Sequence, residues 1–178
     1  MLINLFHNDP FDIEKIHPIE FKSVESYYDF CKTQYFHVCA NNRVLEIGPG
    51  HGLHSQKILE YSPEYFEVIE GHAQSAKKLS LMSGIDNIII DDAMMALKAK
   101  KKFDVVICLG VLYHLHSPLH LLELIVNNCR PTTLILDCVM APSDLAFSFE
   151  ENNRPGNNQT RSDWLSCDLN LVVPFLTY

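Results

Sequence analysis

The sequence predicts an α/β fold built on a doubly wound parallel sheet, and three observations support this. From Arg43 onward, short β-branched or apolar runs alternate with amphipathic stretches, which is the pattern of parallel strands connected by helices. The first run leads directly into a glycine-rich turn, Gly48-Pro-Gly-His-Gly52. The chain has 178 residues, of which 47% are hydrophobic and 20% charged, and this composition suits a single folded core.

The segment before the first strand is expected to form a cap over this core. Apolar and aromatic residues recur at helical spacing over residues 21–39, after a loop marked by Pro10 and Pro18. We therefore divide the chain into an N-terminal cap or lid, residues 1–39, and a core, residues 40–178. The aromatic residues of the cap favour packing, and any that reach the site would act as a lid: Tyr27, Tyr28, Phe30, Tyr35 and Phe36.

Five strands and four helices account for the core. The predicted strands are residues 43–47, 65–69, 87–90, 103–109 and 132–139. The predicted helices are residues 54–61, 73–83, 93–99 and 118–129, and Gly84 is placed to end the second of them. Residues 150–161 are polar and rich in turn formers, which predicts an exposed loop.

Charge and cysteine usage narrow the function classes. The 14 Lys and Arg residues against 22 Asp and Glu give a net charge of −8, which argues against a broad nucleic-acid surface and favours a small-molecule partner. The six cysteines form no C-x-x-C pair and the N-terminus does not resemble a secretory signal, so we expect reduced structural cysteines in a cytoplasmic protein. No apolar run approaches the roughly 18 residues that cross a bilayer, so no membrane partner is expected.

The glycine-rich turn carries the most specific signal. Its spacing is G-x-G-x-G, whereas a nicotinamide dinucleotide site would place the third glycine at position 53, which is Leu53 here. Glycine allows positive φ and lets a ligand lie against bare backbone. Glu46 lies two residues before the first glycine, where a carboxylate would repel a pyrophosphate but could pair with a cationic ligand group.

Glu46-x-Gly48-x-Gly50-x-Gly52 after an apolar strand resembles motif I of the class I S-adenosylmethionine-dependent methyltransferases. The resemblance extends over about residues 40 to 140. It implies a Rossmann-like doubly wound sheet, S-adenosyl-L-methionine as the cofactor, and a role in cofactor binding for the four residues of the motif. Glu46 and the turn would place the amino-acid end of the cofactor.

The same resemblance assigns the nucleoside end of the cofactor. Glu70, at the end of the second strand, would accept hydrogen bonds from both ribose hydroxyls. Asp92, after the third strand, would accept from the adenine amino group while Ala93 flanks the ring. Asp91 is the close competitor for the role of Asp92, and Asp92 could instead, or in addition, cap the helix that begins after it.

Residues 103–118 resemble the fourth strand and the following loop of this family, and residues 112–118 are especially similar to the subgroup of wobble-uridine carboxymethyltransferases that act on tRNA. The resemblance implies that Leu109 and Gly110 contact the cofactor. It places Tyr113 and His114 at the methyl-donor end, where they could contact the methyl donor, bind a substrate or remove its proton. A packing role for His114 stays open.

Two other groups of residues are given structural interpretations. His114, His116 and His120 lack a fourth ligand at standard spacing, so no metal is expected. The lysines at 98 and 100–102 are expected to lie on a solvated helix end.

The predicted function is therefore a methyltransferase (EC 2.1.1.-) that uses S-adenosylmethionine to methylate an oxygen or nitrogen atom of a small-molecule acceptor. Two alternatives stay open: a cofactor-binding protein or fragment without catalysis, and a transferase that modifies the wobble uridine of tRNA. The family sheet has seven strands, including a C-terminal hairpin, whereas five are counted here. We therefore expect the hairpin to be missing, the C-terminal part to be incomplete, and an exposed sheet edge at which a homodimer could form.

Overall fold

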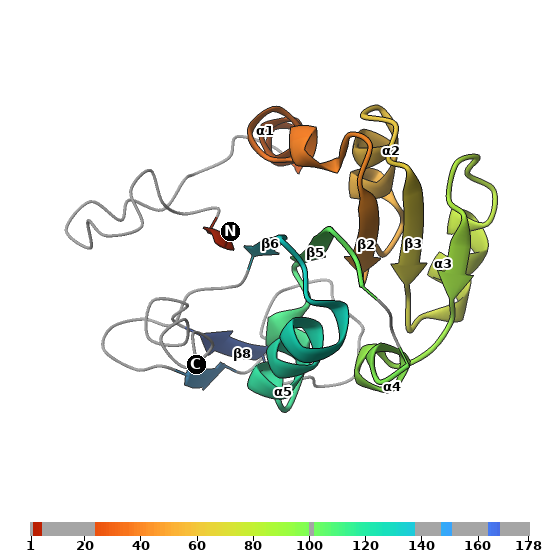
Figure 1. The fold of residues 1–178 in the computed structure, drawn as a ribbon. Helices are drawn as coiled ribbons and strands as arrows, with labels where there is room; N and C mark the ends of the chain where they lie inside the picture. The colour runs from red at the N-terminus through yellow and green to blue at the C-terminus, as the bar shows by residue number, and fades with distance from the viewer. Residues whose placement is uncertain (1, 5–23, 100–101, 138–146, 151–163, 168–178) are drawn as a thin grey trace.

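A computed structural model describes residues 2–4, 24–99, 102–137, 147–150 and 164–167 of the chain. Its main feature is a six-stranded parallel sheet in the order β1-β6-β5-β2-β3-β4 (Figure 1). The strands are β1 (Leu2–Asn4), β2 (Arg43–Ile47), β3 (Tyr65–Ile69), β4 (Asn87–Ile89), β5 (Val105–Leu109) and β6 (Thr133–Asp137). All five predicted strands are present, and the predicted α/β doubly wound fold is confirmed.

Five α-helices connect and cover the strands. They are α1 (Val24–Gln34), α2 (Leu53–Leu59), α3 (Ala73–Leu79), α4 (Ala93–Leu97) and α5 (Pro118–Leu124). Three short helical segments accompany them: the 3₁₀ turns η2 (Phe36–Cys39) and η3 (Leu112–His114), and the π-helical turn η4 (Ile125–Cys129), which continues α5. The predicted cap helix is thus α1 followed by η2, and the predicted helix at 118–129 is α5 followed by η4.

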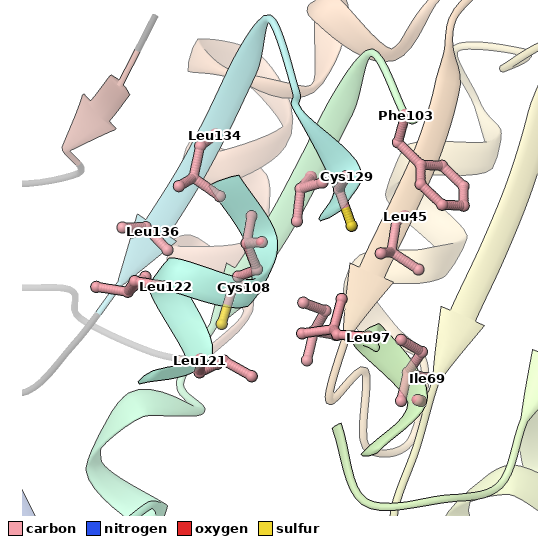
Figure 2. Close-up of a cluster of buried hydrophobic side chains, with 14 of the residues drawn as sticks. Leu45, Ile69, Leu97, Phe103, Cys108, Leu121, Leu122, Cys129, Leu134 and Leu136 are labelled. Carbon is pink, nitrogen blue, oxygen red and sulfur yellow. The ribbon is translucent and has the colours of Figure 1, made fainter. Parts of the chain in front are cut away.

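Strand side chains alternate between two cores, one on each face of the sheet. Leu45 and Cys108 belong to the core that also contains Leu97 of α4 and Leu121 of α5 (Figure 2). Their neighbours along the strands, such as Val44, belong to the opposite core with side chains of α1, α2 and α3. This period of two, with both faces apolar, is expected of a parallel sheet covered by helices. Since both faces are covered, the ends of the strands are where a site can form.

The sheet edge beside β6 is occupied by β1, which the sequence analysis did not predict. Leu2, Ile3 and Asn4 pair in parallel with Leu134, Ile135 and Leu136. The expectation of an exposed edge at this strand is therefore wrong, and the argument for a homodimer at that edge loses its basis. A strand of three residues is too short to give a periodic signal.

A separate antiparallel sheet consists of β7 (Phe147–Glu150) and β8 (Trp164–Cys167). Within the described part of the chain, this hairpin does not join the six-stranded sheet. The edge beside β6, where the family places its C-terminal hairpin, is instead occupied by β1. Strand β8 lies against η3 instead. The loop near Pro10 and Pro18, most of the predicted loop at 150–161, residues 138–139 and the lysines at 100 and 101 lie outside the described residues.

Cysteines contribute to both cores. Cys31 and Cys39 lie in the core beneath α1, and Cys108 and Cys129 lie in the core beneath α5; all four are buried and reduced. These four therefore act as small apolar side chains, as predicted. Among the helices that the structure describes, none combines the length and the hydropathy needed to cross a membrane.

Candidate functional site

The strand order places a crevice at the carboxyl ends of β2 and β5. The chain runs from β2 outward to β3 and β4, and then returns to β5 and β6 on the other side of β2. Ligands of open α/β sheets bind at such a reversal of strand order. A pocket of about 310 Å³ lies there. It is lined by Tyr28, Gly48, Pro49, Gly50, His51, Leu53, His54, Leu109, Gly110, Tyr113 and Asp137.

The three glycines of the turn have different reasons to be glycine. All three have positive φ, at 66° for Gly48, 57° for Gly50 and 80° for Gly52. A Cβ atom on Gly48 would lie 2.5 Å from Val111 Cγ2, and one on Gly52 would lie 2.5 Å from Met82 Cε. A Cβ atom on Gly50 would meet nothing within 4 Å. Gly48 and Gly52 are therefore required for packing, whereas Gly50 presents bare backbone to the pocket.

Glu70 holds the glycine turn from the neighbouring strand. Its carboxylate follows β3 and is only 7% exposed. Glu70 Oε2 accepts a hydrogen bond from the backbone N–H of Gly50 at 2.8 Å, and Oε1 accepts one from the N–H of His72 at 2.7 Å. Each carboxylate oxygen can accept a further hydrogen bond, so Glu70 can orient the turn and still accept from a ligand hydroxyl.

Glu46 is more deeply buried, at 2% exposure, at the end of β2. Ser55 Oγ, in α2, donates a hydrogen bond to Glu46 Oε2 at 2.6 Å. Burial raises the pKa of Glu46 to about 7, the negative charge of Glu70 adds to this rise, and the Ser55 hydrogen bond opposes it. A carboxyl group poised in this way favours its ionised form when a cationic ligand group arrives.

The ends of β5 and β6 form the other wall of the pocket. Leu109 and Asp137 are paired in register, and the N–H of Gly110 donates to the backbone oxygen of Asp137 at 3.3 Å. Tyr113 bends back over this wall, since a Cβ atom on Gly110 would lie 3.1 Å from Tyr113 Oη. His114 does not line the pocket, and partial desolvation of its ring lowers its pKa. The wall therefore presents one tyrosine and one aspartate.

The N-terminal cap contributes Tyr28 to the pocket. The Tyr28 ring lies edge-on to the His54 ring with centroids 4.4 Å apart, and Phe36 contacts the same imidazole with centroids 5.6 Å apart. Burial among these rings lowers the pKa of His54 to about 4, so His54 is neutral at neutral pH. The part of the cap that reaches the pocket is thus aromatic, while the side chain of Tyr27 lies outside the described residues.

Asp92 caps α4. Its Oδ1 atom accepts from the N–H of Met94 at 2.9 Å and from that of Met95 at 3.2 Å, which confirms the capping interpretation. Asp91 Oδ1 accepts from the N–H of Asp92 at 2.8 Å. Asp91, Asp92 and Ala93 do not line the pocket, and the adenine-binding role considered for them stays a prediction.

The predicted site residues therefore fall into three groups. Gly48, Gly50, Leu109, Gly110 and Tyr113 line one pocket. Glu46, Gly52 and Glu70 support the turn beside it. Asp91, Asp92, Ala93 and His114 lie apart from it.

Sequence reasoning missed Asp137. The predicted strand ran on to residue 139 and so placed Asp137 inside it, whereas in the structure Asp137 is the last residue of β6. In the described ranges, no group of three or more His, Cys, Asp or Glu side chains is arranged to hold a metal ion.

Comparisons with known proteins agree with this geometry. A family model described as "Methyltransferase domain" matches residues 33–169. A tRNA U34 carboxymethyltransferase from Nautilia profundicola is 29% identical over 118 residues, which cover 58% of this chain and 36% of that protein. This chain therefore spans about a third of the length of that relative.

Two solved structures show the same fold. The N-terminal domain of EvdMO1 with SAH bound has a TM-score of 0.61 at 18% identity, covering 89% of this chain and 78% of that one. The PH0226 protein from Pyrococcus horikoshii has a TM-score of 0.65 at 14% identity, with coverage of 89% and 82%.

Proposed function

The chain belongs to the methyltransferase domain family, and on this premise we propose that it methylates an oxygen or nitrogen atom of a small-molecule acceptor. S-adenosylmethionine is the methyl donor of this family. The observation that carries the proposal for this chain is the bare Gly50 backbone, which faces the pocket while the Glu70 carboxylate holds it in place. Such a turn lets a ligand lie against the Gly50 backbone and also hydrogen-bond to the buried Glu70 carboxylate.

The residues present fit the cofactor. The Gly48–Gly50 turn offers backbone to its amino-acid end, and Glu46 offers a carboxyl group that ionises more readily beside a cation. Glu70 retains acceptor capacity for the ribose hydroxyls. The Oδ1 atom of Asp92 is engaged in capping, which leaves Oδ2 as the acceptor for an adenine amino group.

When bound, S-adenosylmethionine supplies a methyl group that is already activated by the positive charge on sulfur. The chain must then align the acceptor with that group, exclude water, and receive a proton where the acceptor carries one. Tyr113, at the wall where the acceptor would approach, and Tyr28 of the cap both line the pocket. On this basis we propose that α1, which carries Tyr28 within the predicted cap of residues 1–39, acts as a lid.

Binding of S-adenosylhomocysteine, measured by isothermal titration calorimetry, tests the proposal. We expect the full chain to bind this product, and Glu70→Ala to weaken binding by about 1–3 kcal/mol because two hydrogen bonds to the ligand are lost. Glu67→Gln is the matched control, since Glu67 is also buried on β3 but bonds to Tyr65 and Asn87 away from the pocket. A folded wild-type chain that does not bind the product would contradict the proposal.

A second candidate, modification of the wobble uridine in tRNA, is favoured by the Nautilia relative. It predicts RNA binding that weakens steeply as salt is raised, because phosphate contacts release counterions. The net charge of −8 argues against such binding. A filter-binding assay with total tRNA at low salt separates the two candidates, and retention of the product ligand without RNA binding supports the small-molecule acceptor.

The remaining alternative is a protein that binds the cofactor without catalysis. Mass spectrometry of the purified protein detects bound cofactor, and a methyl-release assay over a set of amine and hydroxyl acceptors detects turnover. Bound cofactor without turnover on any acceptor would favour this alternative.

A further inference from the structure

We propose that the carboxylate of Asp137 binds the methyl acceptor, and that it selects acceptors whose reacting atom carries an N–H or O–H group. This inference rests on the methyl transfer proposed above. Asp137 was not among the predicted site residues. The strand order, the residues that line the pocket and their charges support a role for it in binding the acceptor.

Strand order divides the crevice between two reactants. The groups proposed to hold the amino-acid and nucleoside ends of the cofactor lie at the ends of β2, β3 and β4: the glycine turn after β2, Glu70 after β3 and Asp92 after β4, while Leu109 and Gly110 at the end of β5 are expected to contact the cofactor from the other side. The ends of β5 and β6 lie on the other side of β2 and line the same pocket. We therefore expect the second reactant to approach beyond Gly110, over the end of β6.

Asp137 is the last residue of β6 and is fixed in position. It pairs in register with Leu109, and its backbone oxygen accepts from the N–H of Gly110. Leu109 and Gly110 line the pocket together with Asp137, and Tyr113 folds over the same wall. The aspartate is therefore held at the end of the sheet and lines the same pocket as Tyr113, at the point where we expect an acceptor to enter.

The charges around the pocket give this position its selectivity. Asp137 is the single carboxylate among the described lining residues, and those residues include no lysine or arginine. His54 is neutral at neutral pH because burial lowers its pKa to about 4. An acceptor with an anionic reacting group would be repelled, whereas an amine or hydroxyl would donate a hydrogen bond to the carboxylate.

The proposed step balances with these groups alone. The lone pair of the acceptor atom forms the new bond to the methyl carbon while the carbon–sulfur bond breaks and sulfur keeps its electron pair. The proton that the acceptor atom carried passes to the Asp137 carboxylate and from there to solvent. The products are the methylated acceptor and neutral S-adenosylhomocysteine.

The test uses sinefungin, a cofactor analogue that carries an amine on carbon in place of the methylsulfonium. This amine probes whatever faces the transferred methyl group, so the acceptor need not be known. We expect wild-type protein to bind sinefungin about tenfold more tightly than S-adenosylhomocysteine, since a charge-assisted hydrogen bond to Asp137 is gained. In Asp137→Asn the ratio of the two affinities should fall about fivefold or more, while the affinity for S-adenosylhomocysteine changes less than about twofold.

Controls separate this role from a structural one. Glu123→Gln removes one negative charge from an exposed position on α5 and should leave the ratio unchanged. Asp137→Ser provides a second variant should Asp137→Asn fail to fold. Equal weakening of both ligands, or an unchanged ratio in the Asp137 variants, would overturn the proposal, whereas failure of the wild-type protein to bind either ligand would instead overturn the proposed function.

Discussion

The two sides of the crevice differ in how their side chains relate to the pocket: Glu46 and Glu70 on the β2–β3 side support the glycine turn beside it, whereas Tyr113 and Asp137 on the β5–β6 side line it directly. Glu70 accepts from the backbone of Gly50 and His72, and Glu46 accepts from Ser55. Across the crevice, Tyr113 and Asp137 belong to the pocket wall itself. The first side is thus a unit whose members fix each other before any ligand binds.

This difference suggests that one side of the crevice binds the cofactor and the other selects the methyl acceptor. A preorganised cofactor side needs particular residues at particular spacings, because each group must reach its partner on the turn. An acceptor side needs only that a suitable side chain end a strand, so its identity can change without disturbing the fold. Substitutions on the first side should therefore disturb the glycine turn together with its hydrogen bonds, and those on the second should change how the pocket binds a ligand.

The largest expected effect tests whether the glycine turn is such a unit. Gly52→Ala should lower the free energy of unfolding by about 2–4 kcal/mol, because it adds backbone strain at positive φ and places a Cβ atom 2.7 Å from Cδ2 of the buried Leu79 as well as 2.5 Å from Met82 Cε. Gly50→Ala should cost only about 1–2 kcal/mol of stability, because its Cβ atom meets nothing within 4 Å. Its Cβ atom would instead enter the ligand space and weaken S-adenosylhomocysteine binding.

Urea denaturation and calorimetry on the two variants check this contrast. Equal losses of stability in Gly50→Ala and Gly52→Ala would show that both glycines serve packing. Unchanged ligand affinity in Gly50→Ala would show that the turn does not face the cofactor.

These glycines also show which features of the site can be predicted from sequence. Their spacing after an apolar strand predicted the turn, and the alternation of runs predicted five strands, because both are local patterns. Asp137 was missed because its role depends on pairing with Leu109, a contact between distant segments. The interactions that fix Glu46 and Glu70 likewise became visible only when strand ends were brought together.

A second expectation concerns pH, because two buried groups on the cofactor side titrate in opposite senses. Glu46 has its pKa raised to about 7 from 4.5, so the folded state holds a proton that the unfolded state has lost, and stability falls as pH rises between these values. His54 has its pKa lowered to about 4 from 6.5, so the unfolded state takes up a proton first, and stability falls as pH drops through that range. Each shift changes the free energy of unfolding by about 3 kcal/mol over its pH range, and because the two changes have opposite signs they largely cancel in the wild-type chain.

Single substitutions should expose each slope. Glu46→Gln retains an acceptor for Ser55 and should give a protein whose stability rises from pH 4 to pH 6.5, because only the His54 effect is left. His54→Phe keeps aromatic contacts with Tyr28 and Phe36 and should show stability falling from pH 4.5 to pH 7. Urea unfolding across this pH range measures both, and parallel profiles for the two variants would contradict the expected signs.

The smallest effect separates the two roles considered for Asp92. Asp92→Asn keeps an oxygen to cap α4, so the free energy of unfolding should change by less than about 0.5 kcal/mol. Its amide nitrogen cannot accept from an adenine amino group, so S-adenosylhomocysteine should bind several-fold more weakly. Asp92→Ala should additionally lose about 1 kcal/mol of stability through loss of the cap.

Isothermal titration of these two variants with S-adenosylhomocysteine tests whether Asp92 binds the nucleoside end of the cofactor. Equal ligand affinity in Asp92→Asn and wild-type protein would leave Asp92 with capping alone. Asp91→Asn tests the competing residue, and weaker binding in Asp91→Asn but not in Asp92→Asn would assign the adenine-binding role to Asp91.

Strand β1 also has a consequence for the order in which the chain can fold. It pairs with β6 across a separation of about 130 residues, the strand whose last residue is Asp137. Closing so long a loop costs conformational entropy that is repaid only once its partner strand is formed, so such non-local pairing is slow. During synthesis the first strand must therefore wait until the last strand of the sheet has left the ribosome, and the edge beside the acceptor wall is the part of the sheet completed last.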